Sequence, residues 1–96
     1  MTKTTRRVRR TSQFKKGYKN SEKQGRNMKL VEDIIIMLAN DEPLAAKYKD
    51  HALVGNWKGF RECHVTPDWL LVYKKTDKNE LLLTLTRLAS HSELNF

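Results

Sequence analysis

The sequence has one cysteine, two prolines and no long apolar run, and these scarcities exclude several classes of protein. A lone Cys63 cannot form an internal disulfide, so a reducing, cytoplasmic location is expected. No stretch of about 18 apolar residues is present, so a membrane partner is not expected. The basic start is not followed by an apolar segment, which argues against a secretion signal. The 96 residues are expected to form a single small domain.

Acidic residues are scarce in the first third of the chain. Residues 1–29 hold eleven Lys or Arg and one acid, whereas residues 30–96 hold eight Lys or Arg and ten acids. The two parts carry net charges of +10 and −2, consistent with the +8 of the whole chain. Such clustering favours a polyanion or an acidic protein partner over charge carried only for solubility.

The N-terminal half is predicted to be mainly helical. Residues 1–10 fit either a basic arm or an edge strand, because Thr and Val favour strands and edge strands tolerate charge. A helix then begins with Thr11 or Ser12 as its cap, and residues 20–27 form a connection. Residues 27–40 are the clearest helix, because their apolar residues recur at helical spacing.

The C-terminal half changes to a period of two. After an irregular connection over residues 41–58, strands are predicted over residues 59–66, 69–76 and 80–88. The fold class is therefore α+β. Two N-terminal helices are expected to pack on one face of a small antiparallel sheet. This sheet is a three-stranded meander, to which residues 1–10 would add an edge strand if they do not form a basic arm.

A two-residue turn at Pro67-Asp68 would set the faces of the hairpin. It would pair Val65 with Leu70 and His64 with Leu71. Alternation then divides the hairpin into a core face and an opposite face that His64 shares with Glu62. The core face would hold Cys63, Val65, Leu70 and Val72, and the opposite face Glu62, His64, Thr66, Trp69, Leu71 and Tyr73. 

The last strand carries a stripe of Leu81, Leu83 and Leu85 that Arg87 interrupts. An arginine does not belong in the core. Either a bulge intervenes or Arg87 lies past the edge of the sheet.

Residues 44–96 resemble the YafQ branch of the RelE/ParE superfamily, bacterial toxins of toxin–antitoxin pairs. The C-terminal Arg87, His91 and Phe96 match in type and order, although Phe96 follows His91 by five residues where relatives usually have four. The matching central positions are Lys49-Asp50-His51, Leu53, Gly55, Trp57-Lys58-Gly59, Arg61, His64, Pro67-Asp68-Trp69, Leu71 and Tyr73.

This resemblance implies a RelE-like, microbial-ribonuclease-like fold and an endoribonuclease, or mRNA interferase, that needs no cofactor. Its substrate would be messenger RNA in the ribosomal A site, with ribosomal RNA as a further contact. A small antitoxin of the DinJ or RelB kind would silence it. The family's functional positions correspond to catalytic His51, His64, Asp68 and His91, to Arg87 for phosphate, to Phe96 for substrate and to the acid Glu62.

The chemistry of RNA cleavage suits these residue types. When the 2′-hydroxyl attacks the neighbouring phosphate, one group takes a proton and another gives one to the departing oxygen. Histidine suits both tasks because its ordinary pKa lies near neutrality. We expect His91 to be the general acid, with His64 or Asp68 assisting deprotonation and His51 orienting. Phosphate contacts are expected from Arg87 and, less directly, from Lys58 or Arg61.

A metal site is not expected, because Cys63 and His64 point to opposite sheet faces and no paired-ligand spacing occurs. The main alternative function is a non-catalytic RNA- or ribosome-binding module of the same fold. It would need the basic region but not His64 and His91 together. A gyrase-poisoning toxin is a further alternative, against which the set of histidines argues.

Overall fold

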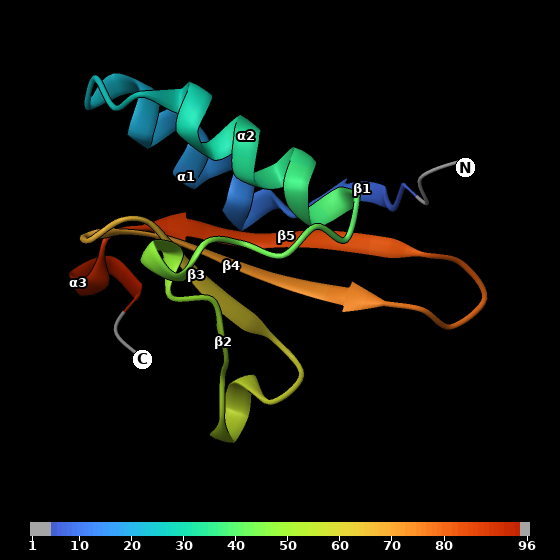
Figure 1. Cartoon of the computed structure of the whole chain (residues 1–96). Coiled ribbons are helices and arrows are strands. Elements are labelled where there is room, and N and C mark those ends of the chain that lie inside the picture. Colours follow the sequence, from blue (N-terminus) through green and yellow to red (C-terminus); the bar gives the residue numbers. More distant parts are fainter. Residues whose placement is uncertain (1–4, 95–96) are drawn as a thin grey trace.

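The computed structural model describes residues 5–94, so residues 1–4 of the predicted arm and Phe96 lie outside the described part. The two long helices cover one side of the sheet, and α3 and the segment around β2 lie on the other side (Figure 1). No helix of residues 5–94 is long and apolar enough to cross a membrane. In chain order the elements are β1 (Arg7–Arg10), α1 (Ser12–Lys23), α2 (Met28–Ala39), the 3-10 helix η1 (Ala46–Tyr48), β2 (His51–Ala52), the 3-10 helix η2 (Gly55–Trp57), β3 (Arg61–Thr66), β4 (Trp69–Thr76), β5 (Leu82–Ala89) and α3 (His91–Leu94).

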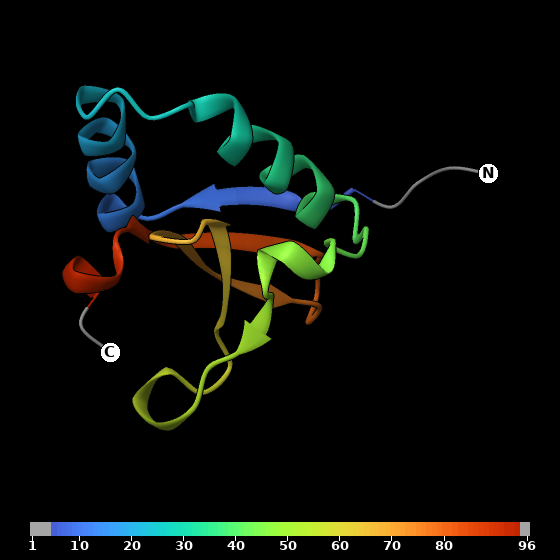
Figure 2. The same cartoon turned by 60° about the vertical axis from the view of Figure 1, so that its left-hand side comes forward.

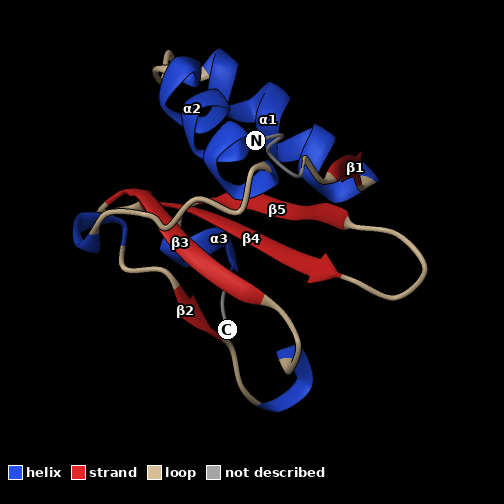
Figure 3. Cartoon of the chain, turned by 45° about the vertical axis from the view of Figure 1, so that its right-hand side comes forward, coloured by secondary structure: helices blue, strands red, loops and turns tan. Residues whose placement is uncertain are grey.

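The sheet has five strands in the order β1-β5-β4-β3-β2 (Figure 3). Neighbouring strands from β2 to β5 are antiparallel, whereas β1 runs parallel to β5. The α+β class and the N-terminal edge strand are confirmed, but the sheet is mixed and not purely antiparallel. The prediction did not include β2, because a strand of two residues carries no alternating pattern.

Helix α1 is longer than predicted. Residues 20–23, expected in a connection, continue the helix, and Thr11 accepts the N–H of Phe14 as its N-cap. The helix ends where Gly25 adopts φ 77°, and the N–H groups of Gly25 and Arg26 donate to the carbonyls of Glu22 and Ser21. This pair of hydrogen bonds defines a Schellman motif. The motif requires one residue in the left-handed conformation, which glycine adopts without steric cost.

Helix α2 matches its predicted span. The side chain of Asn27 caps it by accepting the N–H of Lys29. A second Schellman end follows, in which Asp41 and Glu42 donate to the carbonyls of Leu38 and Met37. Here the left-handed position, at φ 55°, is taken by Asp41.

The β3–β4 hairpin contains a bulge that the sequence analysis did not predict. Thr66 pairs with Trp69 as expected, but His64 pairs with Leu70, so Val65 is an extra residue in β3. The predicted pairs Val65–Leu70 and His64–Leu71 are therefore wrong. A slip of one residue exchanges the two faces of a strand, so the assignment of every β4 side chain is reversed.

As a result, Trp69, Leu71 and Tyr73 join Cys63 and Val65 beneath the helices. The indole Nε1 of Trp69 donates to Ser21 of α1 at 3.0 Å. The opposite face has a smaller apolar cluster, with partly buried side chains from the β2–β3 segment packed against it. That cluster consists of Leu70, Val72, Ala89 and Leu94, flanked by Leu53, Trp57 and Phe60.

Strand β5 contains a second bulge, which resolves the position of Arg87. Val72 pairs with Arg87 and Tyr73 with Leu85, so Thr86 is the extra residue. The extra residue shifts the in–out alternation of side chains along β5 by one position. Leu88 therefore points into the main core, and Arg87 points to the opposite face. Of the two predicted explanations for Arg87, the bulge is confirmed.

Candidate active site

One row of paired residues crosses the face opposite α1 and α2. His51 pairs with Glu62, Glu62 with Val72, and Val72 with Arg87. Paired residues of antiparallel strands point to the same face, so strands β2, β3 and β5 place a histidine, an acid and an arginine together. The expectation that His64 shares a face with Glu62 is confirmed by the pairing of His64 with Leu70 on this face.

His51 is held at both ring nitrogens. Its Nε2 lies 3.4 Å from Oε1 of Glu62, and its Nδ1 lies 2.7 Å from the carbonyl oxygen of Lys49. Glu62 is buried, whereas the His51 side chain is half exposed. This fixed orientation suits a residue that positions substrate or a second catalytic group.

The three histidines form an arc with His64 at its centre. The ring centroids of His51 and His64 are 6.3 Å apart, and those of His64 and His91 are 5.6 Å apart. At these separations the rings are near neighbours that face one region of the surface, so groups of one bound substrate can lie close to more than one histidine. The Nδ1 of His64 lies 3.3 Å from the carbonyl oxygen of Pro67, which leaves its Nε2 for other contacts.

The short helix α3 brings His91 to this arc. Ser90 and Glu93 form a reciprocal capping box, in which each backbone N–H donates to the side chain of the other residue. The hydrogen bonds from Ser90, together with the positive charges of Arg26 and Arg87, hold the pKa of Glu93 below its ordinary value. Asp68 accepts the backbone N–H of His91 at 3.4 Å, which links the β3–β4 turn to the start of α3.

Arg61 and Cys63 lie on the helix side of β3, away from the three histidines. Arg61 donates to Asp50 at 3.1 Å, and the hydroxyl of Tyr73 donates to the other oxygen of the same carboxylate. Burial, followed by this bond to Asp50, raises the pKa of Tyr73. Asp50 immediately precedes His51, so the three residues brace the segment that holds His51. Burial also raises the pKa of the Cys63 thiol to about 12, which makes it a poor nucleophile.

Two of the predicted site residues, Lys58 and Phe96, have no described contact with the three histidines. Lys58 is exposed in the segment that projects away from the helices between β2 and β3 (Figure 2). Phe96 lies outside the described residues. Within residues 5–94, no group of three His, Cys, Asp or Glu is arranged to hold a metal ion.

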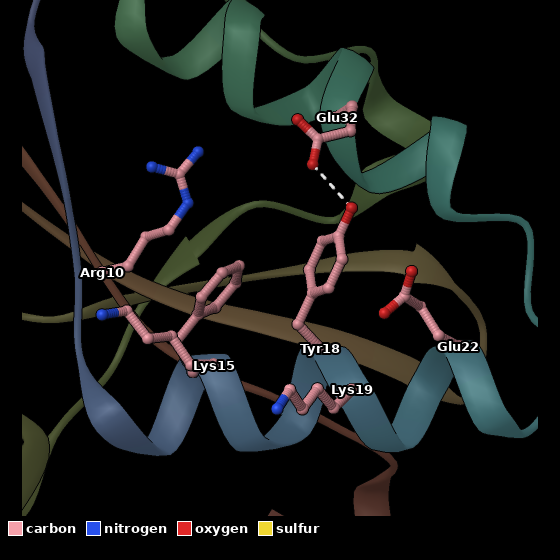
Figure 4. A pocket seen from close by; sticks show the side chains of 7 residues that line it. Arg10, Lys15, Tyr18, Lys19, Glu22 and Glu32 are labelled. Atoms are coloured by element: carbon pink, nitrogen blue, oxygen red, sulfur yellow. Dashed lines mark hydrogen bonds between the residues drawn. The ribbon is translucent and has the colours of Figure 1, made fainter.

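Two of the surface hollows within residues 5–94 differ in their relation to the histidines. One lies on the helix side, where Tyr18 of α1 donates to Glu32 of α2 at 2.8 Å and Arg10 is a further lining residue (Figure 4). It contains none of the three histidines. The other, of about 330 Å³, is lined by His64 and by Tyr48 of η1. The sequence analysis did not predict the second hollow, because residues 41–58 show no periodicity that would place Tyr48 near His64.

Fold and site together define a small basic α+β protein with an acid–base cluster of histidines on the sheet face opposite its helices. Residues 6–95 match the family described as the bacterial toxin of type II toxin–antitoxin systems, YafQ. The chain is 42% identical over 85 residues to the mRNA interferase toxin YafQ of Escherichia coli K12, covering 88% of this chain and 89% of that protein. The chain belongs to the YafQ family of bacterial toxins.

Solved structures agree with this assignment. The E. coli DinJ–YafQ toxin–antitoxin complex matches with a TM-score of 0.84 and 41% identity, covering 94% of this chain and 97% of that chain. A metal-bound toxin from Helicobacter pylori matches with a TM-score of 0.84 and 48% identity, covering 91% of this chain and 96% of that chain. The RelE-like, microbial-ribonuclease-like class expected from the sequence is therefore refined to a YafQ-like α+β fold with a five-stranded mixed sheet.

Proposed function

We propose that this protein is the toxin of a type II toxin–antitoxin pair and an mRNA interferase that cuts messenger RNA in the ribosomal A site. The observation that carries the proposal is the arc of His51, His64 and His91, which three separate elements bring together. A non-catalytic RNA-binding module has no need for two neighbouring histidine pairs on one sheet face. The relatives that match most of the chain include a protein named as an mRNA interferase.

The exposure and the contacts of each group support the following roles. His91 is exposed at the start of α3 and acts as the general acid that protonates the departing 5′ oxygen. His64, at the centre of the arc, takes the proton of the attacking 2′-hydroxyl. His51 orients the substrate, since both of its ring nitrogens are engaged. Arg87 stabilises the negative charge on the phosphorane oxygens from the same face.

Asp68 and Glu62 support the histidines in this scheme. Asp68 holds the backbone of His91 and is therefore a positioning residue. Glu62 is buried against His51 and fixes the orientation of that ring. These contacts favour His64 over Asp68 as the group that assists deprotonation.

The partners follow from the charge distribution. The first 29 residues carry a net charge of +10, which suits the phosphate backbone of ribosomal RNA or an acidic antitoxin segment. The related DinJ–YafQ pair crystallised as a toxin–antitoxin complex, and a DinJ- or RelB-like antitoxin is the corresponding partner here. A cytoplasmic location accords with ribosomal RNA and messenger RNA as the proposed partners.

Replacing His91 by Ala tests the proposal. Because a positioned general acid contributes roughly 10²–10⁴-fold to a rate, His91→Ala should lower message cleavage by about that factor. Cleavage is measured by mapping 5′ ends of messages after induced expression, and by single-turnover assays with ribosomes carrying a defined message.

Ser92→Ala, in the same short helix, is the matched control and should cut like the wild type. Codon-phased cuts that depend on translation and disappear in His91→Ala support the enzyme. Growth arrest by the wild type without such cuts, or unchanged cutting by His91→Ala, would contradict the assignment.

A further inference from the structure

A hollow adjoins the histidine arc at the far end of β3. It lies between the start of α2, the 3-10 helix η1 and the turn at Pro67. Leu30 and Tyr48 give it an apolar wall, Lys47 and Thr66 contribute polar groups, and His64 is one of its lining residues. We refer to it as the Tyr48 hollow.

The strand pairing explains why this hollow is open. β2 pairs only with Arg61 and Glu62 of β3, so β2 does not cover the later part of that strand. There η1 packs beside β3, and the bulge at Val65 breaks the regular pleat. Bulges are common next to active sites, and beside this one His64, the central residue of the arc, also lines the hollow.

The lining of the hollow suits a flat ring. Tyr48 offers an aromatic surface, and the Nζ of Lys47 lies over that ring, 5.1 Å from its centroid. A base that stacks on this face would move the flexible, exposed Lys47 side chain aside, toward the phosphate backbone. Leu30, which is 38% exposed, presents an apolar side chain to solvent at the rim. Nucleobases bind single-strand-specific proteins by stacking on such aromatic side chains, with nearby cations that attract the backbone.

Size and position limit the occupant further. A volume of about 330 Å³ is near the lower end of the ~300–1,000 Å³ typical of small-ligand sites, so a base with its sugar fits and a protein helix does not. His64 belongs to the arc and also lines the hollow. A nucleotide whose phosphate lies at His64 would therefore have its own base within reach of Tyr48.

We propose that the Tyr48 hollow binds the base of a nucleotide that adjoins the scissile phosphate, with the ring of Tyr48 as the stacking surface. This inference rests on the proposed ribonuclease function. It assigns to η1 a role in holding the message, in addition to the proton chemistry of the three histidines.

A double-mutant cycle tests this role by combining removal of a base from the message with removal of the Tyr48 ring from the protein. Messages with an abasic nucleotide on one or the other side of the cut are placed in the ribosomal A site and compared with the intact message in single-turnover cleavage. The wild type should cut one of the two abasic messages roughly 10- to 100-fold more slowly, the effect of losing one base–aromatic stack. Tyr48→Ala should cut that abasic message and the intact message equally slowly, and Tyr48→Phe should behave like the wild type.

The cycle separates binding from folding, because Tyr48 is also partly buried against the core. A merely structural Tyr48 would make Tyr48→Ala slower on intact and abasic messages by the same additional factor, and that result would overturn the inference. Equal cutting of all three messages by the wild type would overturn it as well. If the wild type cuts no message at all, the proposed ribonuclease function itself fails, which is a different and recognisable result.

Discussion

Gly17 is a point of close approach between α1 and the backbone of the sheet. A Cβ at this position would lie 2.1 Å from the carbonyl oxygen of Leu88 in β5. The next turn of the helix is fixed as well, because the Ser21 hydroxyl donates to the Gly17 carbonyl and accepts from Trp69. The close approach lets α1 lie directly on β5 just before that strand leads into α3 and His91.

Gly17→Ala should therefore destabilise the protein, although alanine is the better helix former by about 0.8–1 kcal/mol. The clash is with backbone, which cannot rotate away, so we expect a net loss of about 1–3 kcal/mol in the free energy of unfolding. Urea denaturation followed by circular dichroism measures it. Asn20→Ala, at an exposed position of the same helix, should be neutral or slightly stabilising. A Gly17→Ala protein as stable as the wild type would show that α1 sits farther from β5 than described.

At the scale of whole elements, the end of α2 is tied to two strands by one carboxylate. Asp41 accepts from Nε of Arg6 at 2.7 Å and from Nζ of Lys75 in β4 at 2.8 Å. Arg6 is buried just before β1, and it also reaches Asp77 and the carbonyls of Thr76 and Leu82. This junction explains why the left-handed position after α2 is occupied by an aspartate, since glycine would make neither ion pair.

Hydrogen bonds from Arg6 and then Lys75 hold the pKa of Asp41 below its ordinary value of about 3.9. The stabilisation is therefore present above that value and is lost as the pH falls through the folded-state pKa. Asp41→Asn, which tolerates the left-handed backbone, should lower stability by about 1 kcal/mol at pH 7, since the carboxylate is partly exposed. In urea titrations the difference in stability between the wild type and the variant should shrink as the pH is lowered from 7 to 3. A difference that is the same at both pH values would contradict the ion-pair explanation.

The elements also show where sequence patterns are informative. The span of α2 was predictable because its apolar spacing and its cap are local, and the span of β4 was predictable because Pro67-Asp68 and residues 77–79 bound it. The bulges at Val65 and Thr86 carry no glycine or proline to mark them, since they arise from how three strands pack together. The faces of β4 could therefore not be assigned correctly. The histidines were found by resemblance, whereas the contribution of η1 depends on tertiary packing alone.

For the molecule as a whole, the basic helix and the histidines lie on opposite sides of the sheet. α1 carries exposed lysines on the helix side, and α3 with His91 lies on the other side (Figure 1). A protein held on ribosomal RNA by α1 would thus keep its histidine face free for the message. With ribosomal RNA bound at α1, affinity and chemistry would depend on different residues, and each could be changed without the other.

This separation predicts the salt dependence of ribosome binding. Each lysine that neutralises a phosphate releases a counterion, so its removal makes the plot of log affinity against log salt concentration shallower by about 0.7–0.9. Replacing the exposed Lys16 and Lys23 of α1 by Gln should reduce the slope by roughly 1–2 while leaving the cleavage rate of bound complexes unchanged. Lys78→Gln, in the β4–β5 turn, should leave the slope as it is. Binding titrations over a series of salt concentrations measure the slopes, and equal slopes for the wild type and the α1 variant would place the ribosome contact elsewhere.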